Sequence, residues 1–222
     1  MANDNFSGYK REDKKRAKAL EYKGVDMEFE NVNPFEFKKG MYCELNKLGA
    51  TSIREANEEI WEDVLETSGI DEDVYEDLES YDDSVTFSLV GAVSETLDIP
   101  AGDVLEMFGV YWATDVAPKA YGDYFNAFGN DFHSFVEGLD EMHVRITEML
   151  PSLVPPSFDI EKINDEHFTI HYKSQRDGLA PLAVGMLKGI AKHFGGEADI
   201  TQIEYKGTDD HDVFEVRFTE NE

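Results

Sequence analysis

The chain contains little cysteine and few basic residues for its length. Cys43 is the single cysteine among 222 residues, which excludes an intrachain disulfide framework and a zinc site built from several thiolates. Lysine and arginine number 20 against 48 aspartate and glutamate residues, so the net charge is -28. A surface of this sign disfavours nonspecific binding to nucleic acid or to anionic lipid. We therefore expect neither a nucleic-acid partner nor a membrane-surface partner.

Long apolar runs and several catalytic motifs are also absent. No stretch is long enough to cross a bilayer, and the first residues are polar and charged, unlike a secretory signal peptide. These features predict a soluble, cytoplasmic protein. The sequence contains no GxSxG, no P-loop, no Rossmann glycine signature and no HExxH. These absences favour a binding protein over an enzyme.

The residue distribution predicts a short extension followed by one domain. Residues 1–40 hold nine of the basic residues and little apolar period, so we expect a basic, mobile extension. A capping box at Ser52 and Glu55 begins the first clear helix, and Gly69 ends it. Further helices are predicted over 85–97, 101–108 before Gly109, and 132–150.

The pattern changes at Pro155 and Pro156, which forbid a helix. Beyond them we predict a helix over 179–194, closed by Gly195, and strands over 157–160, 167–173, 199–205 and 212–218. The expected fold class is α+β, in which a helical N-terminal part (41–155) packs on a C-terminal antiparallel sheet with a helix (156–222). Residues 41–222 are expected to form a single domain.

The segment from His171 to Arg176 predicts an anion site. If it is a strand, Tyr172, Ser174 and Arg176 project to one face, the same face as the apolar Phe168 and Ile170. Arginine is seldom buried without a partner, and its planar fork suits a carboxylate.

His143 is the second candidate residue. It lies on the apolar face of a predicted helix, a face that also contains Phe132, Val136, Leu139, Ile146 and Leu150. Two interpretations fit this spacing. The commoner one is a core histidine hydrogen-bonded to a carbonyl, and the other is a metal ligand.

A lone histidine on an apolar face and a Tyr-x-Ser-x-Arg segment together suit haem, a flat apolar molecule with carboxylate tails. The combination resembles the haem–nitric oxide/oxygen binding (H-NOX) family, which includes the sensor domain of soluble guanylate cyclase. The resemblance covers about residues 41–219. Its matching segments are 90–92, 108–112, 139–143, 155–158, 172–179 and 211–214.

The resemblance implies a role for each candidate residue. His143 would be the proximal ligand of the iron of haem b, and Tyr172, Ser174 and Arg176 would bind the propionates. Pro156 matches a proline that presses on the haem, although a boundary kink also explains it. Trp112 falls at a distal-pocket position, and a core aromatic is the alternative. Members that bind oxygen stably place a tyrosine where this chain has Pro181, so we predict discrimination against oxygen.

The function implied is a gas sensor with a five-coordinate ferrous haem. It would bind nitric oxide and carbon monoxide and signal to a separate protein, a histidine kinase or a cyclic-dinucleotide signalling enzyme. One alternative is a haem-free interaction scaffold in which Tyr172, Ser174 and Arg176 satisfy internal carboxylates. A haem peroxidase is disfavoured because the sequence shows no evident distal pair of histidine and arginine.

Overall fold

The computed structural model describes residues 58–70, 83–119, 128–149, 154–164 and 166–221. The predicted extension 1–40 and the capping box at Ser52 and Glu55 lie outside these residues. The described helices are α3 (Glu58–Ser68), α4 (Asp83–Leu97), α5 (Ala101–Tyr111), the π-helical turn η3 (Trp112–Val116), α7 (Phe132–Glu137), α8 (Leu139–Met149) and α9 (Ala180–His193). The strands are β1 (Ser157–Asn164), β2 (His167–Lys173), β3 (Gly196–Glu204) and β4 (Asp212–Glu220).

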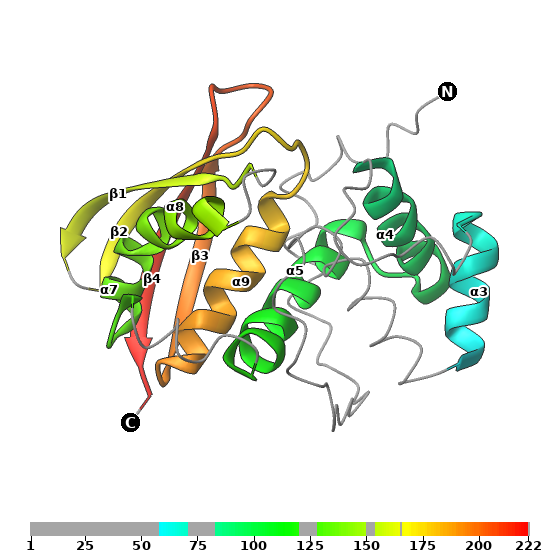
Figure 1. Cartoon of the computed structure of the whole chain (residues 1–222), viewed down its shortest axis with the longest axis horizontal. Helices are drawn as coiled ribbons and strands as arrows, with labels where there is room; N and C mark the ends of the chain where they lie inside the picture. The colour runs from blue at the N-terminus through cyan, green and yellow to red at the C-terminus, as the bar shows by residue number, and fades with distance from the viewer. Residues whose placement is uncertain (1–57, 71–82, 120–127, 150–153, 165, 222) are drawn as a thin grey trace.

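The strands form a four-stranded antiparallel sheet in the order β1-β2-β4-β3. The predicted α+β class is therefore confirmed, with helices in the first part of the described chain and the sheet in the second (Figure 1). On β2, Phe168, Ile170 and Tyr172 are buried, whereas the residues between them are partly exposed. This alternation follows from the pleat of a strand and gives the sheet one apolar face.

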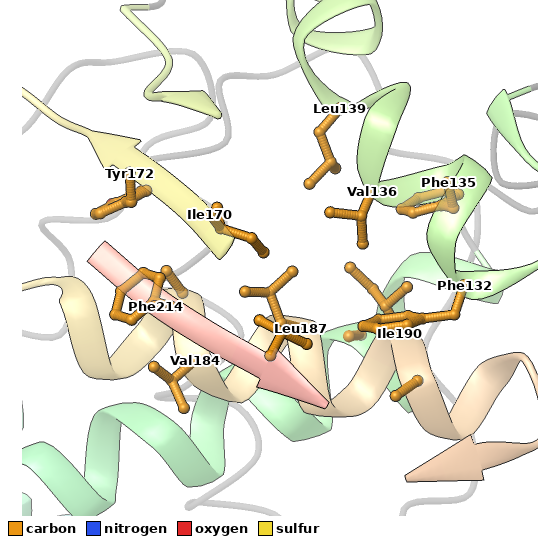
Figure 2. Packing of buried hydrophobic residues seen from close by; sticks show 14 of the residues in the cluster. Phe132, Phe135, Val136, Leu139, Ile170, Tyr172, Val184, Leu187, Ile190 and Phe214 are labelled. Atoms are coloured by element: carbon orange, nitrogen blue, oxygen red, sulfur yellow. The ribbon is translucent and has the colours of Figure 1, made fainter. Parts of the chain in front are cut away.

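Helices α7, α8 and α9 supply the side chains that cover this apolar face (Figure 1). Figure 2 shows Phe132 and Val136 of α7, Leu187 and Ile190 of α9 and Ile170 of β2 in one hydrophobic cluster. Phe132, Phe168 and Phe214 are almost completely inaccessible to solvent. A second, smaller cluster joins α3 to α4 through Trp61, Val64, Leu89, Ala92 and Val93. Of the helices in the described ranges, none combines the length and apolar character needed to cross a membrane.

Gly109 does not end its helix, contrary to the sequence prediction. Helix α5 continues to Tyr111, and Gly109 lies where α5 crosses α9. A Cβ atom at Gly109 would be 2.4 Å from the carbonyl oxygen of Leu182, and one at Gly185 would be 2.0 Å from that of Glu106. The two backbones can approach this closely only because both positions lack a side chain. An ion pair between Lys188 and Glu106 joins the same two helices.

The long helix predicted over 132–150 is two helices, with Gly138 between them. Asp131 caps α7 by accepting a hydrogen bond from the backbone N–H of Ser134 at 2.8 Å. A Cβ atom at Gly138 would be 2.7 Å from the carbonyl oxygen of Phe128, so the chain passes close to itself there. The break after Glu137 makes α8, which carries His143, a separate element.

Candidate functional site

Tyr172 is the last buried residue on the core face of β2. It is 5% exposed, and its ring centroid lies 5.4 Å from that of Phe158 and 5.9 Å from that of Phe214. Figure 2 shows Tyr172 on the same side of β2 as Ile170. The alternation that was expected for Phe168, Ile170 and Tyr172 is therefore confirmed.

The alternation does not extend to Ser174 and Arg176. Strand β2 ends at Lys173, and the residues after it form a bend. The Ser174 hydroxyl oxygen accepts a hydrogen bond from the backbone N–H of Arg176 at 3.1 Å, which folds the chain back on itself. Gly178 follows with a φ of +78°, a left-handed conformation that favours glycine. The prediction of one straight Tyr-x-Ser-x-Arg strand was wrong, because a serine side chain here competes with the sheet for the backbone.

We call residues 174–178 the anion loop. Helix α4 holds one side of it, since Arg176 Nε lies 2.6 Å from Asp83 Oδ1 and a Cβ atom at Gly178 would be 3.7 Å from the Phe87 ring. The hairpin between β3 and β4 holds the other side, since Lys206 Nζ donates a hydrogen bond to the Ser174 carbonyl oxygen at 2.7 Å. Figure 1 shows this hairpin and the end of β2 extending from the same end of the sheet.

Asp212 fixes the hairpin that carries Lys206. Its Oδ1 accepts hydrogen bonds from Gln202 Nε2 at 2.7 Å and from the backbone N–H of Lys206 at 2.9 Å. Burial raises the pKa of Asp212 above its usual value, against the opposing effect of the Lys206 backbone N–H. Because Asp212 pairs with Tyr172 across β4 and β2, the hairpin is in register with the candidate site. Sequence analysis missed Asp83, Lys206 and Asp212, since no local pattern links residues so far apart in the chain.

His143 lies on the inner side of α8 and is 8% exposed. Its Nδ1 atom is buried and, within the described residues, has no hydrogen-bond partner. The interpretation of His143 as a core histidine bonded through Nδ1 to a carbonyl therefore loses support. Burial lowers the pKa of His143 to about 4, and the opposing effect of the nearby Asp140 charge is smaller. The imidazole is therefore neutral near pH 7, which is the form that ligates a metal.

Phe158 connects His143 to Tyr172. Its ring stacks on the His143 imidazole with centroids 5.6 Å apart and an interplanar angle of 15°, and it also contacts Tyr172. The Asp140 Oδ1 atom accepts a hydrogen bond from the Phe158 N–H at 2.7 Å, which attaches α8 to β1. Stacking covers the face of the imidazole, whereas a metal binds in its plane, so the two contacts do not compete for the same atoms.

The remaining candidates lie around the same core. Trp112 begins the π-helical turn after α5 and packs against the main hydrophobic cluster. Such turns often occur at functional positions. Pro156 is half-buried immediately before β1, and Pro181 is half-buried in the first turn of α9. Pro181 is followed by three buried apolar residues, Leu182, Ala183 and Val184.

The residues present fit haem by their chemistry. A buried, neutral imidazole with an unsatisfied nitrogen suits the iron, and a guanidinium held in a loop with a serine and a tyrosine nearby suits carboxylates. The fold and site thus define an α+β domain with a histidine on one element and an anion loop on another.

Comparison with known proteins identifies the class. A family model described as Haem-NO-binding matches residues 41–202. Soluble guanylate cyclase gcy-37 of Caenorhabditis elegans is 25% identical over 148 residues, which is 65% of this chain and 21% of that protein. The chain thus spans about a fifth of the length of this relative.

Solved structures agree on the fold. A mutant H-NOX protein from S. oneidensis in the Fe(II) state is 26% identical, with a TM-score of 0.70, covering 81% of this chain and 96% of that chain. An H-NOX protein from S. oneidensis in the Fe(II)NO state is 24% identical, with a TM-score of 0.68, covering 80% of this chain and 98% of that chain. This chain belongs to the haem-NO-binding family, and the resemblance predicted from its motifs is confirmed.

Proposed function

We propose that the chain is a haem-based sensor of nitric oxide, with carbon monoxide as a second ligand. One observation carries the proposal: His143 is buried and neutral, its Nδ1 has no hydrogen-bond partner in the described part of the chain, and one aromatic ring separates it from Tyr172. The matched family description supports haem as the bound group.

Each site residue has a proposed task. His143 would hold the iron of haem b. Tyr172, Ser174 and Arg176 would bind the propionates, and Pro156 would press on the haem. When bound, ferrous haem supplies an iron that takes up a diatomic gas. The role of Arg176 is supported by its position in the anion loop, where the guanidinium is largely buried and its Nε lies 2.6 Å from Asp83 Oδ1.

The ligand preference follows from the start of α9. Bound oxygen acquires negative charge and needs a preorganised donor, whereas nitric oxide needs less help. Pro181 has no donor to offer, and the residues after it are apolar and buried. We therefore propose that the site discriminates against oxygen, with Trp112 as a further distal residue.

Helix α8 is the proposed output element. It places His143 on its inner side and the exposed Val144 and Arg145 on its outer side, so a movement of the histidine reaches the surface directly. Helix α8 is a separate element from α7, since the two helices meet at Gly138. We propose that a separate protein in the cytoplasm, a histidine kinase or a cyclic-dinucleotide enzyme, reads this movement.

A second candidate is the haem-free interaction scaffold. The ion pair between Arg176 and Asp83 favours it, because the guanidinium already has an internal carboxylate partner. In that case the anion loop would bind no ligand and would only join α4 to the sheet.

Visible spectra separate the two functions. The chain is expressed with haem available, and the ferrous spectrum is recorded before and after nitric oxide is added. A sensor gives a Soret band that shifts with nitric oxide, and His143→Gly loses the iron–protein bond unless imidazole is supplied. A chain that retains no haem would refute the proposal and support the scaffold.

A matched pair of variants tests the anion loop. Arg176→Leu should weaken haem retention about tenfold or more, as expected for loss of a charge-assisted hydrogen bond. Arg217→Leu is the control, because Arg217 is exposed and contacts Glu215 on the outer face of the sheet. Equal retention in both variants would contradict the assignment of Arg176 to the propionates.

A further inference from the structure

Two histidines meet on the face of the sheet that points away from the core. His171 follows the buried Ile170 on β2 and so projects to the opposite face, and His211 immediately precedes β4. His171 Nδ1 and His211 Nε2 are 2.8 Å apart, and the ring centroids are 5.1 Å apart. The side chains are 24% and 17% exposed, although the Nε2 atom of His171 is itself buried. This pair is separate from the proposed haem site and does not depend on it.

In each ring, a carboxylate lies near the nitrogen that points away from the other ring, which we call the outer nitrogen. His211 Nδ1 lies 3.1 Å from Asp210 Oδ2, and His171 Nε2 lies 3.5 Å from Glu161 Oε1. The Asp210 carboxylate accepts a hydrogen bond from His211 Nδ1, which favours the His211 tautomer with its hydrogen there and leaves a lone pair on the inner Nε2. His171 Nε2 makes no hydrogen bond within the described residues, so His171 is free to carry its hydrogen on the inner Nδ1 and to donate it to His211 Nε2 across 2.8 Å. A metal ion that displaces this one proton would be bound by both inner nitrogens.

We propose that His171 and His211 form a binding site for one divalent transition metal ion, with Zn²⁺ as the reference ion. Imidazole nitrogen suits zinc, copper and nickel. Outer carboxylates are the partners that metal-binding histidines usually have, and they fix the ring orientation. Bonds of about 2.1 Å at a tetrahedral angle place the two nitrogens roughly 3.3 Å apart. The partly exposed rings have to separate by only about 0.5 Å to reach this distance.

The site is open, and its surroundings attract cations. Within the described ranges, no group of three or more His, Cys, Asp or Glu side chains is arranged to hold a metal. The protein therefore supplies two ligands, and water completes the coordination. The net charge of -28 raises the local concentration of cations at the surface. The competing occupant is a proton shared between the two rings, and the test distinguishes it from a metal.

Zinc titration of the full chain, stripped of metal beforehand, tests the site by calorimetry. We expect one zinc ion per chain, binding that is lost in His171→Ala and in His211→Ala, and affinity that falls roughly 10–100-fold in Asp210→Asn. His167→Ala is the matched control, since His167 lies on the same strand and face and contacts Glu215 at 2.8 Å. The control should bind zinc like the wild type.

Paramagnetic resonance of bound Cu²⁺ provides a second readout on the wild type and the single variants. The wild type should show coupling to two imidazole nitrogens, and neither single variant should show this pattern. Zinc binding that persists in His171→Ala or in His211→Ala overturns the proposal. The absence of zinc binding up to about 1 mM, well above the range of a specific site, would also overturn it. The short contact between His171 and His211 would then be a hydrogen bond through a shared proton.

Discussion

His143 gives the folded chain a pH dependence that one substitution isolates. Burial lowers its pKa to about 4, whereas the unfolded chain titrates near the ordinary value of 6.5. Because the folded-state pKa is the lower of the two, the unfolded chain binds more protons between these values. The free energy of unfolding therefore decreases as the pH falls from about 6.5 to about 4, and the loss is complete below that range.

The magnitude follows from the two pKa values. The gap between 6.5 and about 4 is worth about 3 kcal/mol of unfolding free energy. We expect the haem-free wild type to lose about 3 kcal/mol more stability than His143→Leu between pH 7 and pH 4. Leucine is a suitable replacement because it is apolar, does not titrate and fills a similar space against Phe158.

Urea unfolding followed by circular dichroism at a series of pH values measures this difference. His193→Leu is the matched control, because His193 is exposed in the last turn of α9. The control should follow the wild type through the acid range. Equal losses in the wild type and His143→Leu would show that folding does not lower the pKa of this imidazole, and the buried environment assigned to His143 would be wrong.

Three further perturbations address the helix crossing, the anion loop and the ligand preference. Gly185→Ala should destabilise the chain by about 1–3 kcal/mol, because the new Cβ would lie 2.0 Å from a backbone oxygen. Its control is Gly91→Ala, which should stabilise the chain by up to about 1 kcal/mol, because a Cβ there would have no atom within 4 Å. Similar effects of the two in urea unfolding would contradict the close crossing. Lys206→Met should speed haem transfer to an apoglobin about tenfold relative to the exposed control Lys192→Met. An unchanged rate would exclude a role of Lys206 in holding the anion loop. Pro181→Tyr should create an oxy spectrum in air that Pro181→Phe lacks, and a stable oxy complex of the wild type would refute the selectivity argument.

Local signals predicted the elements whose ends depend on nearby residues. Strand β2 has the predicted bounds, and Gly69 and Gly195 end their helices with φ values of +65° and +76°. Gly109 differs because it has an ordinary helical neighbourhood in the sequence. Its reason for being glycine is the backbone of α9, which comes much later in the chain. A sequence pattern does not distinguish a glycine that ends a helix from one that allows a close crossing.

The same distinction applies to the candidate site. The direction of Tyr172 was predictable, since it depends only on the pleat of β2. The bend at Ser174 was not, because a serine hydroxyl bonded to its own loop replaces the next step of the strand. The contacts of Arg176 with Asp83 and of Ser174 with Lys206 depend on how α4 and the hairpin pack, which no local pattern encodes.

The two halves of the proposed haem site are attached to different parts of the molecule. Asp140 attaches α8, and with it His143, to β1, whereas α4 and the β3–β4 hairpin hold the anion loop. Phe158 contacts both His143 and Tyr172, so a displacement of α8 changes a packing contact at the end of β2, just before the anion loop. Close-packed side chains transmit such displacements because they have no free volume to absorb them. A signal that begins at His143 therefore has two physical routes out of the site, one to the exposed side of α8 and one through Phe158 to the sheet.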